Sequence, residues 1–199
     1  MTLSVFEIVL IVFTLLVLLS IVWGTIRLGI SPMPSSRSAR QAMLELCDEA
    51  LLESTDQTIN KPNAGVSDNG PVRIYELGSG WGNVLVALAR RYPQHIIVGY
   101  ELSFVPWLVS IVWVKLLRLN NVRVHRQDFF KADFSPAKLV LCYLYPQGMV
   151  KLQAKLTEEA GSLNYLISHH FAIPHYEPIK TLRIKDIYQA PVYLYKMHN

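Results

Sequence analysis

The chain has 199 residues, 51% of them hydrophobic, and its 19 Lys and Arg against 15 Asp and Glu give a net charge of +4. Because acidic and basic residues are interspersed, the composition argues against nucleic acid as a partner and only slightly favours an anionic membrane surface. The two cysteines, Cys47 and Cys142, lie far apart in the sequence, so no disulfide is expected. Much of the hydrophobic excess lies in the first two dozen residues, and the remainder has the size of one globular domain.

Residues 1–26 are predicted to form one transmembrane helix. From Ile8 to Trp23 every residue is apolar apart from one Thr and one Ser. At about 1.5 Å per residue, the segment can cross a hydrocarbon core of about 30 Å if Glu7 lies near the headgroups. A cleaved signal peptide is the alternative, but no Lys or Arg precedes the apolar run and no small-residue cleavage motif follows it. Basic residues follow the run, which predicts that the rest of the chain lies on the cytoplasmic or mitochondrial matrix side. These residues are Arg27, Arg37 and Arg40.

Residues 27–70 are predicted to hold a linker and a leader helix. Ser31 to Pro34 is rich in turn formers, and Ser36 or Ser38 is suited to cap a helix. Apolar residues then recur at helical spacing, which predicts that this helix packs on the domain as a lid or leader. They are Ala42, Met43, Leu46, Cys47 and Leu51. The polar stretch from Ser54 to Pro71 is predicted to be a surface loop.

From residue 71 to residue 199, segments of strand character alternate with segments of helical periodicity. This alternation predicts an α/β domain with a mostly parallel sheet covered by helices on both faces, as in Rossmann-like folds. Only three residues separate the last two strands, so these strands are expected to form a C-terminal antiparallel hairpin. The predicted strands are 72–77, 95–102, 122–127, 138–145, 163–169, 179–188 and 192–197, and the predicted helices are 81–91, 106–119 and 147–160. The helix that starts at Pro106 is apolar almost all round, and its expected role is buried packing, with contact to a membrane or hydrophobic partner as the alternative.

The most informative motif runs from Glu76 to Gly82, where the first strand turns into the next helix. Its third glycine comes one position earlier than in a dinucleotide-binding loop. An acidic residue followed by Gly-x-Gly-x-Gly resembles the first motif of class I S-adenosylmethionine-dependent methyltransferases. The resemblance implies that the loop holds the methionine and ribose parts of that cofactor, and a purely structural turn is the alternative. The cofactor-binding residues predicted here are Glu76, Leu77, Gly78, Ser79, Gly80 and Gly82.

Two further acidic residues end the next two predicted strands. Glu101, followed by Leu102, comes about twenty residues after the loop, where an acidic side chain accepts hydrogen bonds from ribose hydroxyls in such folds. Asp128 and Phe129 stand where class I methyltransferases commonly hold adenine, although Asp is also an ordinary turn residue. The carboxyl ends of parallel strands are where open sheets bind ligands, so these residues are predicted to complete one cofactor site.

Several stretches resemble the family of ATP synthase c-subunit lysine N-methyltransferases, whose members also carry one N-terminal membrane helix. The matching pieces span nearly all of the chain after the apolar segment. They are Ser31 to Pro34 with the helix after it, Gly99 to Leu102, Pro106 to Val109, Pro146-Gln147 with Met149, Leu152, Lys155 and Leu156, and Phe171, Pro174-His175-Tyr176 and Pro178. The resemblance implies a Rossmann-like class I methyltransferase fold over residues 71–199, S-adenosyl-L-methionine as cofactor, and a lysine of a membrane protein as acceptor. The sequence departs from the family in a longer link at Ser103 to Val105 and in Trp81, where the family often has Asp.

The acceptor pocket is predicted at the end of the fourth strand, from Tyr143, Tyr145 and Pro146, the position that class I enzymes commonly use. Aromatic faces attract a sulfonium or ammonium group, which also makes Trp107 and Tyr176 candidates, although for each aromatic taken alone ordinary core or interface packing is the favoured role. Methyl transfer needs mainly alignment and exclusion of water, and no general base is identified. The spacing of His169, His170 and His175 fits no strong zinc motif, so no metal is predicted.

Three functions remain open at this stage. The first is a membrane-anchored protein-lysine methyltransferase acting on a small membrane protein. The second is a methyltransferase for a lipid, quinone or other apolar small molecule, which the same membrane helix would serve. The third is a noncatalytic membrane-tethered module that acts through protein contacts, and failure to bind the cofactor would favour it.

Overall fold

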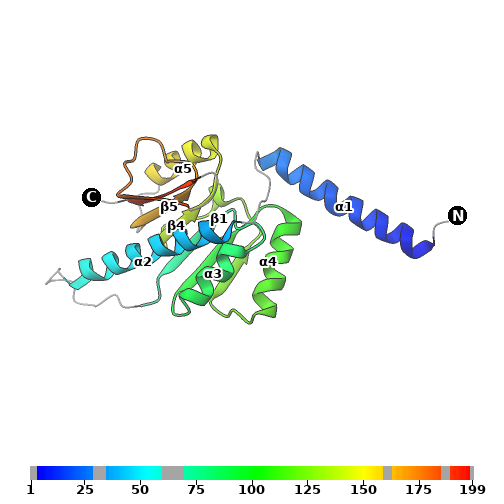
Figure 1. Cartoon of the computed structure of the whole chain (residues 1–199), viewed down its shortest axis with the longest axis horizontal. Helices are drawn as coiled ribbons and strands as arrows, with labels where there is room; N and C mark the ends of the chain where they lie inside the picture. Colours follow the sequence, from blue (N-terminus) through cyan, green and yellow to red (C-terminus); the bar gives the residue numbers. More distant parts are fainter. Residues whose placement is uncertain (1–3, 29–34, 60–69, 159–162, 185–188, 198–199) are drawn as a thin grey trace.

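The computed structural model describes residues 4–28, 35–59, 70–158, 163–184 and 189–197. Its centre is a seven-stranded sheet in the order β3-β2-β1-β4-β5-β7-β6 (Figure 1). Strands β1 to β5 are parallel, β7 runs antiparallel to β5, and β6 antiparallel to β7, which confirms the predicted sheet and hairpin. The strands are β1 (Arg73–Leu77), β2 (Ile96–Tyr100), β3 (Val122–His125), β4 (Ala137–Cys142), β5 (Tyr165–His169), β6 (Lys180–Arg183) and β7 (Pro191–Lys196).

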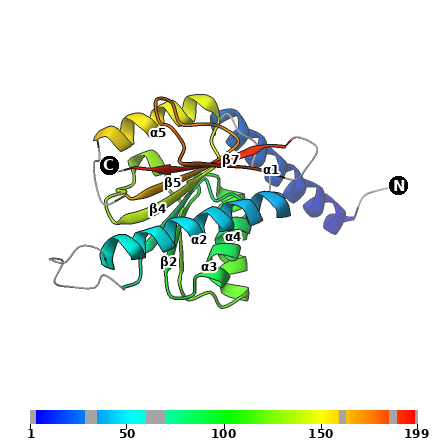
Figure 2. The same ribbon diagram turned by 60° about the vertical axis from the view of Figure 1, so that its left-hand side comes forward.

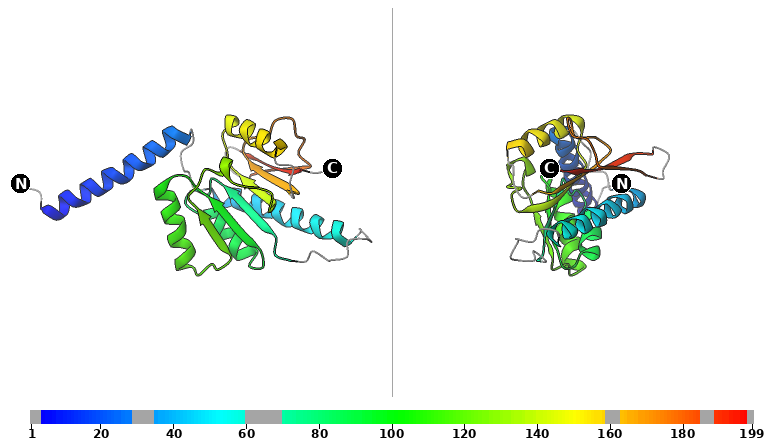
Figure 3. Two further views of the ribbon diagram at one scale, coloured as in Figure 1. Left: turned by 180° about the vertical axis from the view of Figure 1, so that it is seen from behind. Right: turned by 90° about the vertical axis from the view of Figure 1, so that its left-hand side faces the viewer.

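Helices cover the sheet on both faces (Figure 3), and each face has its own apolar core. On one face α2 (Arg37–Ile59) and α3 (Asn83–Arg91) pack on alternate strand residues such as Ile74 and Leu139. On the other face α5 (Pro146–Glu158) and the short helix η1 (Phe129–Lys131) cover the intervening residues, such as Tyr75 and Val140. Helix α4 (Phe104–Leu116) lies beside α3 and the edge strand β3. The alternation of side chains along each strand therefore supplies two cores from one sheet.

The leader helix α2 is built into the domain. Ser36 caps it, as predicted, because its Oγ accepts a hydrogen bond from the backbone N–H of Ala39 at 3.1 Å. The buried side of the helix consists of Ala39, Met43, Leu46, Cys47 and Ala50, which recur at helical spacing. The prediction of a loop from Ser54 was wrong for residues 54–59, which continue the helix. The Ser54 hydroxyl donates to the carbonyl of Ala50 at 2.8 Å, so this polar side chain is satisfied within the helix.

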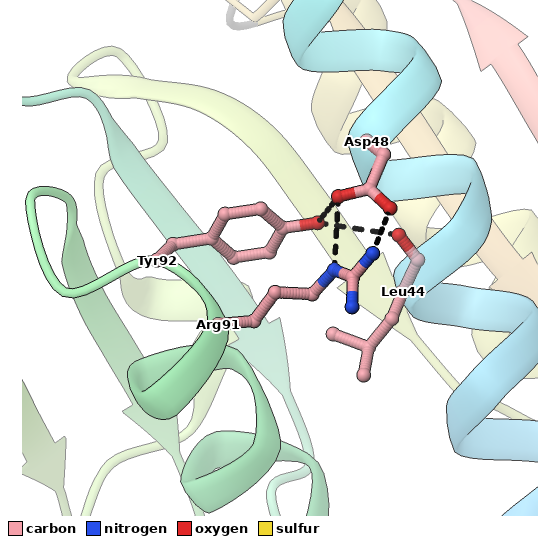
Figure 4. Close-up of polar contacts among 4 residues, drawn as sticks. All are labelled: Leu44, Asp48, Arg91 and Tyr92. Atoms are coloured by element: carbon pink, nitrogen blue, oxygen red, sulfur yellow. Dashed lines mark hydrogen bonds and ion pairs between the residues drawn. The ribbon is translucent and has the colours of Figure 1, made fainter.

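A polar cluster fastens α2 to α3, as Figure 4 shows. The Arg91 guanidinium and the Asp48 carboxylate form an ion pair in which Arg91 Nε lies 2.9 Å from Asp48 Oδ1. The Tyr92 hydroxyl lies 2.7 Å from Asp48 Oδ1 and 3.2 Å from the carbonyl oxygen of Leu44. The Arg91 partner holds the pKa of Asp48 below its ordinary value. The leader helix is thus fixed to the sheet by charge and hydrogen bonds as well as by its apolar side.

Helix α4 differs from its prediction in its bounds and in its burial, and it ends at Leu116, three residues before the predicted end. It begins at Phe104, two residues earlier than expected, because Pro106 then stands in the first turn, where no backbone N–H is needed. The expected burial was wrong: only Pro106 and Ser110 of this helix are buried. Because α4 lies at the edge of the sheet, the domain covers one side of it and leaves the other exposed.

Helix α1 (Val5–Leu28) projects from the domain, as Figure 2 shows from a second direction. The stretch from Val5 to Val22 is long and apolar enough to cross a membrane, and none of it is buried in the domain. The two cysteines are buried on opposite faces of the sheet and form no disulfide. The predicted linker at Ser31 to Pro34 lies outside the described residues, as does part of the predicted strand 179–188.

Candidate functional site

The glycine loop turns sharply between β1 and α3. Gly78, Gly80 and Gly82 all have positive φ angles, of 74°, 53° and 81°. The backbone N–H groups of Gly78 and Ser79 both donate to the carbonyl of Tyr100 at 2.9 Å, which ties the loop to the end of β2. A Cβ on Gly78 or Gly80 would meet nothing within 4 Å, whereas one on Gly82 would lie 2.8 Å from the Cβ of Ser110. The first two glycines therefore border open space, and the third allows α3 to approach α4.

Glu76 places a buried carboxyl group beneath this loop. The residue is 6% exposed, and its Oε2 atom has no hydrogen-bond partner among the described residues. Burial raises its pKa well above the ordinary value, and the nearby charge of Glu101 adds to this effect. A buried carboxyl oxygen without a partner is costly, and a positively charged or hydrogen-bonding ligand would remove this cost.

Glu101 follows β2 and holds the loop from the other side. Its Oε2 accepts a hydrogen bond from the backbone N–H of Gly80 at 2.9 Å, and its Oε1 accepts one from the backbone N–H of Ser103 at 2.7 Å. The residue is 5% exposed. These two backbone donors fix the carboxylate in one orientation, next to the open space that Gly80 borders.

Asp128 and the aromatic residues after it form the third part of the site. The Asp128 side chain accepts a hydrogen bond from the backbone N–H of Phe130 at 3.0 Å and so caps η1. The interpretation of Asp128 as a turn residue is therefore correct, and the same residue also lines the cavity described below. The ring centroids of Phe129 and Phe130 lie 4.3 Å apart with the ring planes tilted by 43°, and the two rings form an apolar wall.

These parts meet in one cavity of about 270 Å³ at the carboxyl ends of β1, β2 and β4. The structure brings together all the predicted site residues except two. Gly82 packs against α4, and Pro146 is the exposed first residue of α5; neither lines the cavity. The predicted residues that line it are Glu76, Leu77, Gly78, Ser79, Gly80, Glu101, Leu102, Asp128, Phe129, Tyr143 and Tyr145.

Other lining residues were not singled out as site residues from the sequence. Met43 lies on α2 and Ser35 lies two residues before its first residue, so the leader segment closes part of the cavity, consistent with its predicted role as a lid or leader. Lys151, which lies on α5, is an exposed cation at the same cavity. Lys151 lies three residues after Gly148, which also lines the cavity, so both lie on the same side of α5. The remaining ones are Trp81, Asn83, Val84, Ser103, Phe130, Cys142, Leu144 and Gly148.

Aromatic rings follow β4 on the side predicted for the acceptor. The ring of Tyr143 lies 4.8 Å from that of His169 at the end of β5. Tyr145 lies against Gly148, where an added Cβ would come within 3.3 Å of its ring. Trp107 and Tyr176 do not line the cavity. Among the described residues, no three His, Cys, Asp or Glu side chains are placed to bind a metal ion.

The sequence of the chain is similar to that of known methyltransferases. The chain is 32% identical over 111 residues to the human lysine N-methyltransferase of the ATP synthase c-subunit. This match covers 53% of this chain and 45% of that protein. The protein of the same name from Xenopus laevis is 31% identical over 143 residues, 69% of this chain and 59% of that protein. The chain thus spans about half the length of these relatives. It is also 24% identical over 124 residues to a protein-lysine N-methyltransferase from Saccharolobus islandicus, which covers 61% of this chain and 77% of that protein.

The fold is similar to that of solved methyltransferases. The crystal structure of an RNA methyltransferase from Salinibacter ruber in complex with S-adenosyl-L-homocysteine matches with a TM-score of 0.62 at 26% identity, over 83% of this chain and 94% of that chain. Residues 76–180, which hold every predicted site residue, match the sequence model of the ANTKMT methyltransferase domain. Since that match covers more than half of the chain, and since the family resemblance agrees with the geometry of the cavity, the chain belongs to the ANTKMT methyltransferase domain family.

Proposed function

We propose that this chain is an S-adenosylmethionine-dependent methyltransferase whose cofactor binds in the cavity between the glycine loop, Glu101 and Phe129. The observation that carries the proposal is the convergence of three sequence-distant segments on one cavity, with a buried carboxyl oxygen of Glu76 that lacks a partner among the described residues. The bound cofactor supplies a methyl group on a positively charged sulfur.

The cavity residues suit the chemical groups of this cofactor. The Glu101 carboxylate, fixed by two backbone N–H groups, is available to accept hydrogen bonds from ribose hydroxyls. The buried Glu76 carboxyl group suits the positive charge of the methionine part, which would favour its ionised form. Phe129 and Phe130 would supply an apolar wall for adenine, and the Asp128 carboxyl group, which lines the same cavity, would be available to its amino group. Gly78 and Gly80 leave the space that the ligand needs.

We infer that the acceptor is a lysine of a small membrane protein. The curated relatives named for lysine N-methylation support this acceptor class. A lysine amine must be neutral to attack a methyl carbon, and desolvation beside Tyr143 and Tyr145 would lower its pKa toward that state. Pro146 does not itself line the cavity, and the role that remains predicted for it is to position its neighbour Tyr145 at the acceptor. A membrane helix at α1 would raise the local concentration of such substrates.

The membrane topology is part of the same proposal. Helix α1 would span the bilayer once, and the basic residues after its apolar stretch favour a domain on the cytoplasmic or mitochondrial matrix side. A small apolar acceptor, such as a quinone or lipid, is the second candidate, because aromatic rings make up much of the acceptor side of the cavity.

Two measurements test the proposal with the full chain in detergent or in vesicles. Calorimetry should detect S-adenosylmethionine and S-adenosylhomocysteine binding, and absence of binding by folded protein would leave the noncatalytic module. Transfer of a labelled methyl group to membrane extracts, followed by separation into protein, lipid and RNA fractions, then identifies the acceptor class. Label in protein, lost on Tyr145→Ala, supports the lysine acceptor, and mass spectrometry of the labelled protein locates the modified residue. Label confined to lipid supports the second candidate, and label in RNA would contradict both.

A further inference from the structure

Helix α4 presents large apolar side chains to solvent. Phe104, Leu108, Val112 and Leu116 recur at every fourth position, which places them along one side of the helix, and Trp113 widens that side. Each of these five residues is between 43% and 68% exposed. We call them the apolar stripe. A contiguous exposed apolar surface of this kind marks an interaction site in a soluble domain.

The length of α4 restricts what the stripe can contact. With 13 residues the helix is about 20 Å long, shorter than the hydrocarbon core of about 30 Å. Its other side is committed to the domain, where Pro106 and Ser110 are buried. The helix is therefore suited to lie on a bilayer, with its stripe at the boundary between headgroups and acyl chains, and unsuited to span one.

The charge around α4 is complementary to an anionic leaflet. Between residues 77 and 127 the sequence has six Lys and Arg but only one acidic residue, Glu101, which is buried. Four of the six basic residues are exposed at α4 and at β3 beside it: Lys115, Arg118, Arg123 and Arg126. The Arg126 guanidinium lies 5.1 Å from the centroid of the Phe104 ring, so charge and stripe adjoin directly. Basic residues close to an anionic surface are attracted to it.

The position of α4 relative to α1 brings the stripe to the membrane side. The C-terminal part of α1 packs against the start of α4, where a Cβ on Gly24 would come within 2.9 Å of Ser103 Oγ. Figures 1 and 3 show α4 on the side of the domain from which α1 projects, running across the direction of α1. If α1 spans the bilayer along the membrane normal, a helix that runs across the direction of α1 lies along the membrane plane.

We propose that α4 is a second, interfacial membrane contact, with the apolar stripe inserted into an anionic leaflet and the surrounding Lys and Arg at the headgroups. The inference rests on the proposed insertion of α1. It goes beyond that insertion, because one spanning helix alone would leave the domain free to rotate and tilt. Two contacts, one across the bilayer and one along it, would fix the orientation of the domain.

The test places a reporter on the stripe of the full chain. Leu116→Cys and Leu52→Cys are labelled with a polarity-sensitive fluorophore; both leucines are 68% exposed, and Leu52 lies on the half of α2 that points away from α1 in Figure 1. The native Cys47 and Cys142 are buried and escape labelling. Each labelled protein is reconstituted into vesicles of phosphatidylcholine alone and of phosphatidylcholine with phosphatidylglycerol, with and without nitroxide-labelled lipid.

Insertion of α4 predicts a blue shift of the label at position 116 and loss of most of its fluorescence to the nitroxide lipid, with no change for the label at position 52. Both effects should be stronger with phosphatidylglycerol and weaker in high salt. Identical spectra of the two labels in all vesicles would overturn the inference. A blue shift of the label at position 116 that is absent in the vesicles and appears only in native membranes, which contain proteins, would also overturn it, in favour of a protein partner.

Two further readouts separate this inference from the proposals on which it rests. S-adenosylmethionine binding is measured on the same samples, so failure of the methyltransferase proposal is seen separately. Vesicle flotation of the unlabelled chain likewise reports on α1 itself.

Discussion

Glu101 and Gly80 are joined by a hydrogen bond of 2.9 Å from the backbone N–H of the loop glycine to the carboxylate, across 21 residues of sequence. The bond fixes the glycine loop relative to the end of β2 and orients the carboxylate at the cavity. The same group therefore shapes the loop and is placed to contact the ligand, which makes it the most direct point at which to test the site.

Glu101→Gln should weaken S-adenosylmethionine binding by roughly 10- to 100-fold, since hydrogen bonds to a charged group contribute about 1.5–3 kcal/mol. The amide keeps one acceptor oxygen but loses the charge and adds donors where the backbone already donates. Calorimetry measures the change. Glu45→Gln, on an exposed residue of α2 outside the cavity, is the matched control and should bind like the unaltered chain. Equal affinities for the two variants would remove Glu101 from the site.

Gly80→Ala and Gly82→Ala should fail in different ways. At Gly80 the added methyl meets only open space, so the substitution should cost about 1 kcal/mol for the left-handed backbone while it obstructs the cofactor. At Gly82 the methyl would come within 2.8 Å of the Ser110 Cβ and should lower the melting temperature further. Thermal unfolding and calorimetry on both variants separate the two effects. The opposite ranking in thermal stability would contradict the assigned roles.

The buried Glu76 predicts a pH-dependent stability. Its pKa in the folded chain lies above the ordinary 4.5, so between these two values the folded state keeps a proton that the unfolded chain releases, and stability falls as pH rises. Glu76→Gln removes this effect. In the absence of cofactor, the melting temperature of Glu76→Gln minus that of the unaltered chain should therefore increase as the pH is raised from about 4.5 toward neutrality. A difference that stays constant with pH would show that the Glu76 carboxyl group is not the source.

Tyr92→Phe tests the attachment of the leader helix. The change removes the hydrogen bond from the tyrosine hydroxyl to Asp48 while it leaves the buried ring in place. We expect a loss of about 1 kcal/mol, or about 2–4 °C in melting temperature. Tyr193→Phe is the control, because its hydroxyl makes no hydrogen bond within the described part of the chain. A similar loss in both variants would argue against a specific role of the polar cluster.

The strands and the meeting of their acidic ends at one cavity could be predicted because local signals and topology agree there. Glycines with positive φ were expected at a tight strand-to-helix turn, and acidic residues at consecutive strand ends had to meet at one edge of a parallel sheet. The cap at Ser36 was readable for the same reason, since it is a local hydrogen bond.

The sequence-based predictions were wrong where contacts between residues far apart in the sequence determine the structure. Periodicity could not show that α4 stands at the sheet edge, so its apolar residues were assigned to the core although Val112 and Leu116 are exposed. The participation of Met43 and Lys151 in the cavity depends on how α2 and α5 pack on the sheet, which no short motif encodes. The predicted start of α4 at Pro106 is two residues late. Proline is accepted anywhere in the first turn of a helix, so Pro106 does not mark the first helical residue.

Ser35, which lines the cavity, follows the last residue of α1, Leu28, by only seven positions. Even fully extended, seven residues reach about 25 Å. With α1 in a bilayer, this short connection limits the distance between the membrane surface and the cavity. Ser35, and the side of the cavity that it lines, can lie no further from the end of α1 than that reach allows. Under the proposed topology, only side chains that emerge close to the lipid would come within range. This would favour small membrane proteins by their distance from the bilayer before any contact in the proposed acceptor pocket discriminates between their sequences.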